Sequence, residues 1–181
     1  MAYGKTIENL EIDGRPAPYP VINERAVRAA SGIMFLIGIS AFFVVFLTQN
    51  YMVLNVVVIL FWLDFFKKAV FQPHISIFYQ LGNWLVKNQQ PEYVGVIQKR
   101  FAWSIGLVLA SIMLLGPVAF SIRGALPFII CSLCLFFMWM ETALGICVGC
   151  KIYKVLLDKK VLKEPEHRPV CPGGVCSISK K

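Results

Sequence analysis

Long apolar stretches alternate with shorter polar ones along this chain. Four of them suggest membrane crossings, at residues 29–47, 51–66, 101–122 and 125–146. A helix rises 1.5 Å per residue, so a hydrocarbon core of about 30 Å needs about 20 residues. The second stretch is short for this, but counting it as a span makes the flanking charges alternate correctly. The pattern therefore predicts an all-α membrane protein with four transmembrane helices in two hairpins.

A different pattern separates the two hairpins. Over residues 70–88, apolar side chains recur one, four, seven and eight positions after Ile77, which is the spacing of one helix face. Pro73 suits the first turn of such a helix. We expect an amphipathic helix that lies on the membrane surface. The alternative is that this segment gates a substrate path.

The two ends of the chain differ from this central domain, residues 29–150. Residues 1–28 carry several acidic side chains and no small-residue cleavage pattern, so they are not a cleaved signal peptide. Asn23 suits the N-cap of the first span. Residues 151–181 form a basic tail that begins as a helical stretch and continues with prolines and glycines, which forbid regular structure. We expect this tail to be mobile.

Composition and charge indicate that most of the chain lies in a membrane. It is 57% hydrophobic and only 15% charged, and its mean hydropathy is +0.67, which is outside the range of a soluble domain. Of its 18 Lys and Arg residues, only Arg123 falls on one side of the predicted membrane. This asymmetry predicts that both termini are cytoplasmic. The net charge of +8 is then explained by topology and anionic lipid headgroups, so we expect the lipid bilayer and no nucleic acid as a partner.

All six cysteines lie after position 130, in three pairs. The pair Cys147-Val-Gly-Cys150 falls at the cytoplasmic exit of the fourth span, where thiols are kept reduced and a structural disulfide is not expected. The pair can instead carry out thiol redox chemistry or sulfur transfer, or it can supply half of a metal site. The alternative is that one or both cysteines are small packing residues. One argument opposes an activated thiol: redox pairs usually open a helix, whose dipole stabilises the thiolate, whereas this pair closes one unless Gly145 or Gly149 ends it early.

The second pair, Cys171 and Cys176, encloses a Gly-rich loop that can bring its two sulfurs together. The linker from Cys150 can extend about 70 Å at most, so the tail can fold back onto the first pair. Cys147, Cys150, Cys171 and Cys176 can then form a zinc or iron site, or the two pairs can exchange disulfides. A tail with incidental cysteines is the alternative.

Within the fourth span, Cys131, Cys134, Met138, Glu141 and Gly145 fall on one helical stripe. Glu141 lies about 13 Å along the axis from Cys150, and an acid at that depth is a functional candidate by default. It is either a proton acceptor for the thiols or a hydrogen-bond partner of a neighbouring helix. For Cys131 and Cys134 we favour packing over an electron relay.

The sequence also supports an expectation for Asp64 and for the two histidines. Asp64 is expected to pair with Lys67 or Lys68 at the interface. The two histidines, His74 and His167, are isolated, and neither is assigned to a site.

Several local patterns together resemble a family of small bacterial integral membrane proteins that is catalogued as a domain of unknown function. They are Asn23-Glu-Arg-Ala-Val-Arg28, Asp64-Phe-Phe-Lys67, Lys99-Arg100-Phe101-Ala102 with Gly106, and the block from Glu141 to Tyr153 that ends the last helix. The resemblance covers about residues 23–155. It implies four membrane helices in a bacterial inner membrane, a functional dithiol at Cys147 and Cys150, and a thioredoxin-like or sulfurtransferase partner protein.

The leading hypothesis is an inner-membrane protein whose Cys147 and Cys150 carry out thiol redox or sulfur-transfer chemistry. Glu141 would deprotonate or tune the thiol site. Cys171 and Cys176 would act as a second, mobile pair of thiols that resolves the product formed at the first pair or delivers to it. Two other hypotheses stay open: a non-enzymatic membrane protein that binds zinc or iron through four cysteines, and a small transporter of a sulfur compound.

Overall fold

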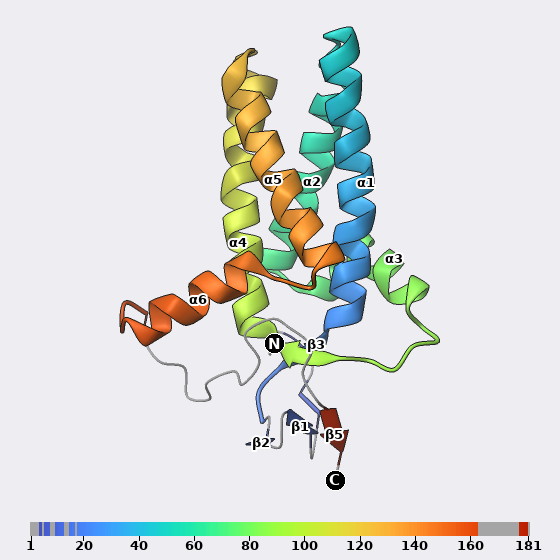
Figure 1. Cartoon of the computed structure of the whole chain (residues 1–181), viewed down its shortest axis with the longest axis vertical. Coiled ribbons are helices and arrows are strands. Elements are labelled where there is room, and N and C mark those ends of the chain that lie inside the picture. The colour runs from blue at the N-terminus through green and yellow to red at the C-terminus, as the bar shows by residue number, and fades with distance from the viewer. Residues whose placement is uncertain are drawn as a thin grey trace.

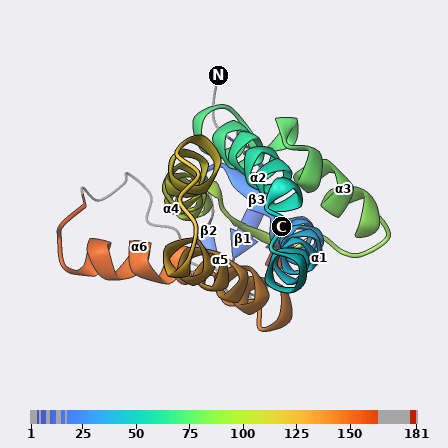
Figure 2. The ribbon, with the colours of Figure 1, turned by 90° about the horizontal axis from the view of Figure 1, so that it is seen from above.

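The computed structural model describes residues 4, 6–7, 10–12, 15–16, 18–162 and 178–180. Four long helices form an antiparallel bundle in this part of the chain, and the view along their axes shows them side by side (Figures 1 and 2). They are α1 (Glu24–Thr48), α2 (Met52–Val70), α4 (Val96–Met113) with the π-helical extension η2 (Leu114–Ala119), and α5 (Ala125–Ala143).

Three of these helices are long and apolar enough to cross a membrane, namely α1, α4 together with η2, and α5. Helix α2 has 19 residues, the same number as α5. Its last two turns carry three charged residues, Asp64, Lys67 and Lys68, whereas the apolar window of each of the other three helices contains at most two. The structure thus supports a helical membrane protein, and the crossing of the bilayer by α2 remains a prediction.

The amphipathic segment between the hairpins is a short 3-10 turn, η1 (Pro73–Ile75), followed by α3 (Ile77–Leu85). Ser76 caps α3 by accepting a hydrogen bond from the backbone N–H of Tyr79 (3.0 Å). The helix packs on α1 through Tyr79 and Gly82, and Phe78 is half-buried against Phe61 of α2. The other predicted apolar side chains are exposed, namely Ile77, Leu81, Trp84 and Leu85. A surface helix is therefore present, shorter than predicted, with an apolar face turned away from the bundle.

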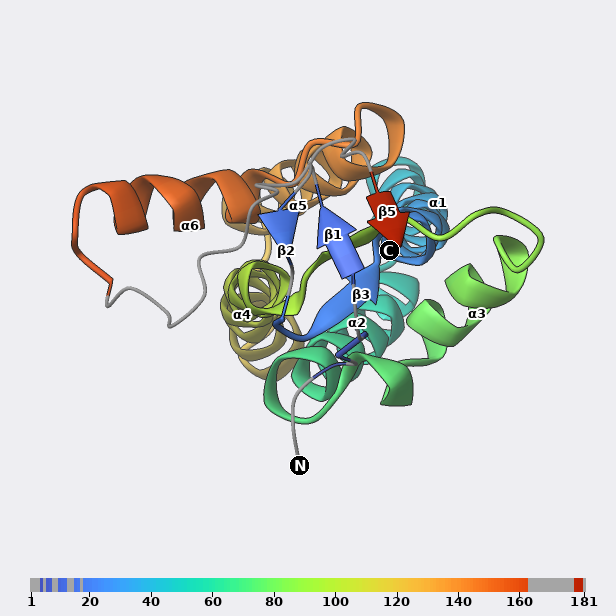
Figure 3. The same ribbon diagram turned by 90° about the horizontal axis from the view of Figure 1, so that it is seen from below.

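Two small antiparallel sheets close the end of the bundle at which α1 begins (Figure 3). Strand β3 (Val21–Asn23) pairs with β4 (Tyr93–Gly95), which ties the segment before α1 to the segment before α4. In the other sheet, β1 (Leu10–Ile12) lies between β2 (Arg15–Pro16) and β5 (Ile178–Lys180). The sequence analysis predicted neither sheet.

The chain beyond α5 has the helical start that was predicted for the tail, although this helix begins earlier, at Val148, and the end of the tail differs from the prediction. A separate helix, α6 (Val148–Asp158), leaves the bundle sideways (Figure 1). Strand β5 then gives the end of the predicted mobile tail a regular partner in β1. The intervening residues 163–177, which include Cys171, Cys176 and His167, lie outside the described residues.

Candidate functional site

The fourth long helix stops before the cysteine pair. Helix α5 ends at Ala143, and the backbone N–H of Ile146 donates to the carbonyl of Met140 (3.1 Å), a bond typical of helix C-terminal motifs. Gly145 has a φ of +65°, in the left-handed region that glycine adopts without strain. A Cβ at this position would also lie 2.5 Å from Nη2 of Arg28. The left-handed backbone therefore favours glycine at position 145, and a side chain there would also displace the end of Arg28.

Because of this turn, the cysteine pair opens a helix instead of closing one. Cys147 is the N-cap residue of α6, and Cys150 lies in the first helical turn. The expectation that the pair closes the last long helix was wrong, and the alternative that this helix ends early, near Gly145, is the one that the structure shows. The argument against an activated thiol is thereby removed, since the amide dipoles at a helix start stabilise a thiolate.

The first turn of α6 is held tightly against α4. A Cβ added at Gly149 would lie 2.5 Å from the Cβ of Ala102 and 2.7 Å from its Cα. Only a residue without a side chain permits this approach between the two helices. The second glycine of the motif therefore fixes the position of the two cysteines relative to α4.

The two sulfur atoms are in direct contact. The Cys150 thiol donates a hydrogen bond to Sγ of Cys147, with 2.6 Å between the sulfurs. Cys147 is 3% exposed and Cys150 is fully buried. The hydrogen bond from Cys150, with the nearby Lys99 ammonium, lowers the pKa of Cys147 against the opposing effects of burial and of Glu141. The same hydrogen bond and burial raise the pKa of Cys150, so the pair is polarised into one thiolate-forming and one proton-holding sulfur.

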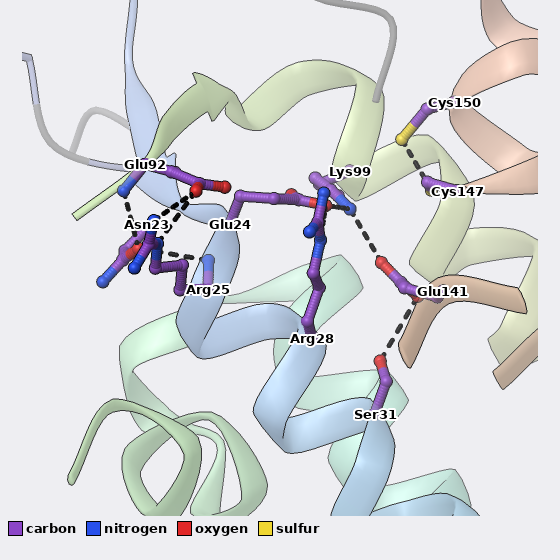
Figure 4. A network of polar contacts seen from close by, with 10 residues as sticks. All are labelled: Asn23, Glu24, Arg25, Arg28, Ser31, Glu92, Lys99, Glu141, Cys147 and Cys150. Carbon is purple, nitrogen blue, oxygen red and sulfur yellow. Dashed lines mark hydrogen bonds and ion pairs between the residues drawn. The ribbon is translucent and has the colours of Figure 1, made fainter. Parts of the chain in front are cut away.

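A buried charge cluster lies beside the sulfurs (Figure 4). Nζ of Lys99 is 2.8 Å from Oε1 of Glu24 and 2.7 Å from Oε1 of Glu141. Lys99 and Glu24 have no exposed surface. Ser31 donates a hydrogen bond to the other carboxylate oxygen of Glu141 (3.3 Å), and Nε of Arg28 lies 3.6 Å from Glu24. Four side chains from α1, α4 and α5 thus form a cluster of two cations and two carboxylates.

This cluster changes the interpretation of Glu141. Its carboxylate bonds to Lys99 and to Ser31 of a neighbouring helix, so it is part of an ion pair. Lys99 is the member whose charge favours the Cys147 thiolate. The structure therefore makes Lys99 the link between the acid and the thiols.

The sequence analysis missed Glu24, Arg28, Ser31 and Lys99 as site residues. Glu24 and Arg28 were noted only near the start of the first span, and Lys99 only as a positive charge that set the topology. One signal was present: an acid within a span needs a buried cation, and Lys99 sits at the start of the third span.

The other residues that were singled out from the sequence lie outside the charge cluster. Asp64 pairs with Lys68 (2.6 Å) and accepts a hydrogen bond from Ser76, which confirms the expected ion pair. Cys131 and Cys134 are half-buried in α5. Among the described residues no group of three or more His, Cys, Asp or Glu side chains forms a metal site. The four-cysteine site remains untested, because Cys171 and Cys176 lie outside those residues.

Comparison with known proteins gives one match. The profile of the family described as a domain of unknown function, DUF4395, matches residues 22–158. This agrees with the resemblance to an uncharacterised family. No curated protein and no solved structure matches the chain.

Proposed function

The chain belongs to the DUF4395 family, which has no assigned function, and we propose that it is a thiol redox or sulfur-transfer protein of the membrane. Cys147 is the attacking sulfur and Cys150 the resolving one. The observation that carries this proposal is the contact of 2.6 Å between the two sulfurs at the start of α6, next to the Lys99 ammonium.

The placement in the membrane is part of the proposal. All four long helices cross the bilayer, α2 included, and the end that carries the basic residues and both termini faces the cytoplasm. At this end α6 presents exposed Lys151 and Lys154 beside exposed Ile152 and Val155, a pattern that suits the interface of an anionic leaflet. The dithiol then lies where the bundle meets the cytoplasmic headgroups of a bacterial inner membrane.

The chemistry follows from the polarised pair. The Cys147 thiolate attacks one sulfur of a disulfide and forms a mixed disulfide, while the other partner sulfur leaves as a thiolate. Cys150 loses its proton, attacks Sγ of Cys147 and releases the partner in its reduced form. With a donor of sulfane sulfur such as thiosulfate, the Cys147 thiolate attacks the outer sulfur, the bond between that sulfur and the rest of the donor breaks, sulfite leaves, and a persulfide remains on Cys147.

A thioredoxin-like or sulfurtransferase protein is the proposed partner. Because Cys147 is 3% exposed, the start of α6 has to move away from α4 before a protein can reach it. The tail pair Cys171 and Cys176 is proposed as a second exchange partner. Strand β5 begins two residues after Cys176 and pairs with β1, so the end of the tail returns to the N-terminal segment.

The test is thiol trapping on protein purified anaerobically in mild detergent. We expect C150S to accumulate a mixed disulfide or a persulfide on Cys147 when a disulfide or thiosulfate is added, and C147S/C150S to accumulate none. The variant C131S/C134S is the matched control, and it should behave as the parent. Equal accumulation of the adduct in C150S and C147S/C150S would overturn the proposal, as would stoichiometric zinc or iron that is lost in C171S/C176S.

A further inference from the structure

A cavity of about 150 Å³ lies inside the bundle and reaches the dithiol. Its wall includes Cys147, Val148 and Gly149 at one end and Leu54 and Met113 at the other. Along α4 the lining residues extend from Ala102 to Met113, which corresponds to about 16 Å of helix. The cavity therefore leads from the thiols toward the middle of the predicted bilayer.

The two ends of the cavity differ in chemistry. Polar groups gather near the dithiol, where Ser31, Lys68 and Glu141 contribute to the wall. The rest of the lining is apolar or sulfur-bearing, with side chains such as Val57, Phe61 and Leu109. A matching ligand has a small head that accepts hydrogen bonds and an apolar remainder. Nucleotide cofactors are excluded, because their charged phosphates find no place among apolar side chains.

The size of the cavity narrows the class of ligand further. An apolar cavity of about 150 Å³ in another protein holds one benzene ring. A single six-membered ring fits this volume, and a chain attached to the ring has to leave the bundle toward the lipid. Helix α5 offers the exit, because Pro127 and Leu135 are its only buried residues within the described chain.

We propose that the cavity binds the ring of a membrane quinone, which serves as the electron acceptor for Cys147 and Cys150. This inference rests on the proposed redox function of the pair. Cys147 lines the cavity although only 3% of its surface is exposed, so a small ligand in the cavity meets a thiol that a protein partner cannot reach directly. The Lys68 ammonium lines the cavity and also pairs with Asp64, and it provides the hydrogen-bond donor for a carbonyl oxygen of the ring.

The electrons and protons of this step balance. The Cys147 thiolate and the Cys150 thiol lose two electrons in total as the bond between their sulfurs forms. The quinone gains these two electrons and becomes a quinol, which needs two protons. One comes from the Cys150 thiol, and the other comes from water by way of the Lys99–Glu141 pair. The Cys147–Cys150 disulfide then oxidises two thiols of the partner protein, by the reverse of the exchange described under the proposed function, and the pair is reduced again.

Decylubiquinone, a short-chain benzoquinone, is the probe for this step. It is added to reduced parent protein in detergent, the loss of quinone absorbance is followed, and the sulfurs at positions 147 and 150 are counted by mass-tagged alkylation. The water-soluble oxidant diamide is used in parallel. We expect one decylubiquinone reduced per chain, with formation of the Cys147–Cys150 disulfide, and no reduction by C147S.

A variant that fills the cavity tests the location. Ala110 lines the cavity, whereas Val108 on the same helix is exposed. We expect A110F to slow quinone reduction at least tenfold while its dithiol is still oxidised by diamide, and V108F to match the parent. If A110F does not fold, M138W narrows the same cavity from α5.

The possible failures are distinguishable. Oxidation of the pair by diamide but not by decylubiquinone would overturn the quinone proposal and leave the dithiol function standing. Equal quinone reduction by A110F and the parent would overturn the assignment of the cavity. A pair that neither oxidant converts would overturn the proposed function itself.

Discussion

Replacement of Lys99 by methionine is the most informative perturbation of the charge cluster. The ammonium is 2.8 Å from Glu24 and 2.7 Å from Glu141, so the two oxygens that it bridges are at most about 5.5 Å apart. At an effective dielectric constant of about 20, the repulsion between the two bare carboxylates at that distance is roughly 3 kcal/mol. Loss of one partner from a buried ion pair usually costs about 3–5 kcal/mol. We therefore expect K99M to lower the free energy of unfolding by about 3–5 kcal/mol.

The assay is reversible unfolding of the purified protein in mixed detergent micelles, followed by helical circular dichroism. The matched control is K151M, because Lys151 is an exposed lysine beside the cysteine motif, where a change of less than about 0.5 kcal/mol is expected. The double variant K99M/E141Q should recover at least half of the loss, because it removes the repulsion and leaves Glu24 near Arg28. A loss below about 1 kcal/mol in K99M, or no recovery in the double variant, would refute the reasoning.

Three further predictions concern the thiols and the two glycines that position them. The Cys150 hydrogen bond and Lys99 lower the pKa of Cys147. The rate of its alkylation by iodoacetamide should therefore rise with pH and reach half its maximum below pH 8.5, about the pKa of a free thiol, and the midpoint should be higher in K99M. A midpoint of the parent at or above about pH 8.5 would contradict this. G145A should cost about 1–3 kcal/mol in the unfolding assay, because an alanine at a φ of +65° is strained and the end of Arg28 has to move aside. G116A should cost less, because the nearest atom to its added Cβ is 3.9 Å away. Equal losses in the two variants would contradict this reasoning. G149A should separate α6 from α4 and slow disulfide formation between Cys147 and Cys150. A102G/G149A should restore only part of the rate, because it removes the opposing Cβ but leaves the Cα that lies 2.7 Å from the new Cβ. An unchanged rate in G149A would argue against this packing.

The helices of this protein were largely predictable from hydropathy. Apolar stretches of membrane length appear in the structure as α1, α4 and α5, and the amphipathic spacing after Ile77 appears as α3. These patterns depend on neighbours a few residues apart, which a sequence displays directly.

The helix break at Gly145 was harder to predict. One glycine inside a helix costs only about 1 kcal/mol, so the apolar residues around it favoured an uninterrupted helix. The space beside Gly145 is filled by Arg28 of α1, a neighbour far away in the sequence that local patterns do not reveal. The consequence of the break is large, because it reverses the position of the cysteine pair from a helix end to a helix start.

The charge cluster could not be assembled from sequence at all. Lys99 meets Glu24, 75 residues away, and Glu141, 42 residues away, and periodicity says nothing about contacts at such separations. Glu141 was predicted because an acid in an apolar stretch is conspicuous. Glu24 and Lys99 were overlooked because they lie at span ends, where charges are common.

The most direct test of the central claim is a redox titration of the parent protein at Cys147 and Cys150. The protein is equilibrated in buffers of reduced and oxidised dithiothreitol, the remaining thiols are trapped with a mass-tagged maleimide, and peptides are quantified by mass spectrometry. The account predicts that both cysteines change together and reversibly in a single two-electron transition, while Cys131 and Cys134 stay reduced. Two cysteines that remain reduced throughout, or that oxidise independently of each other, would contradict it.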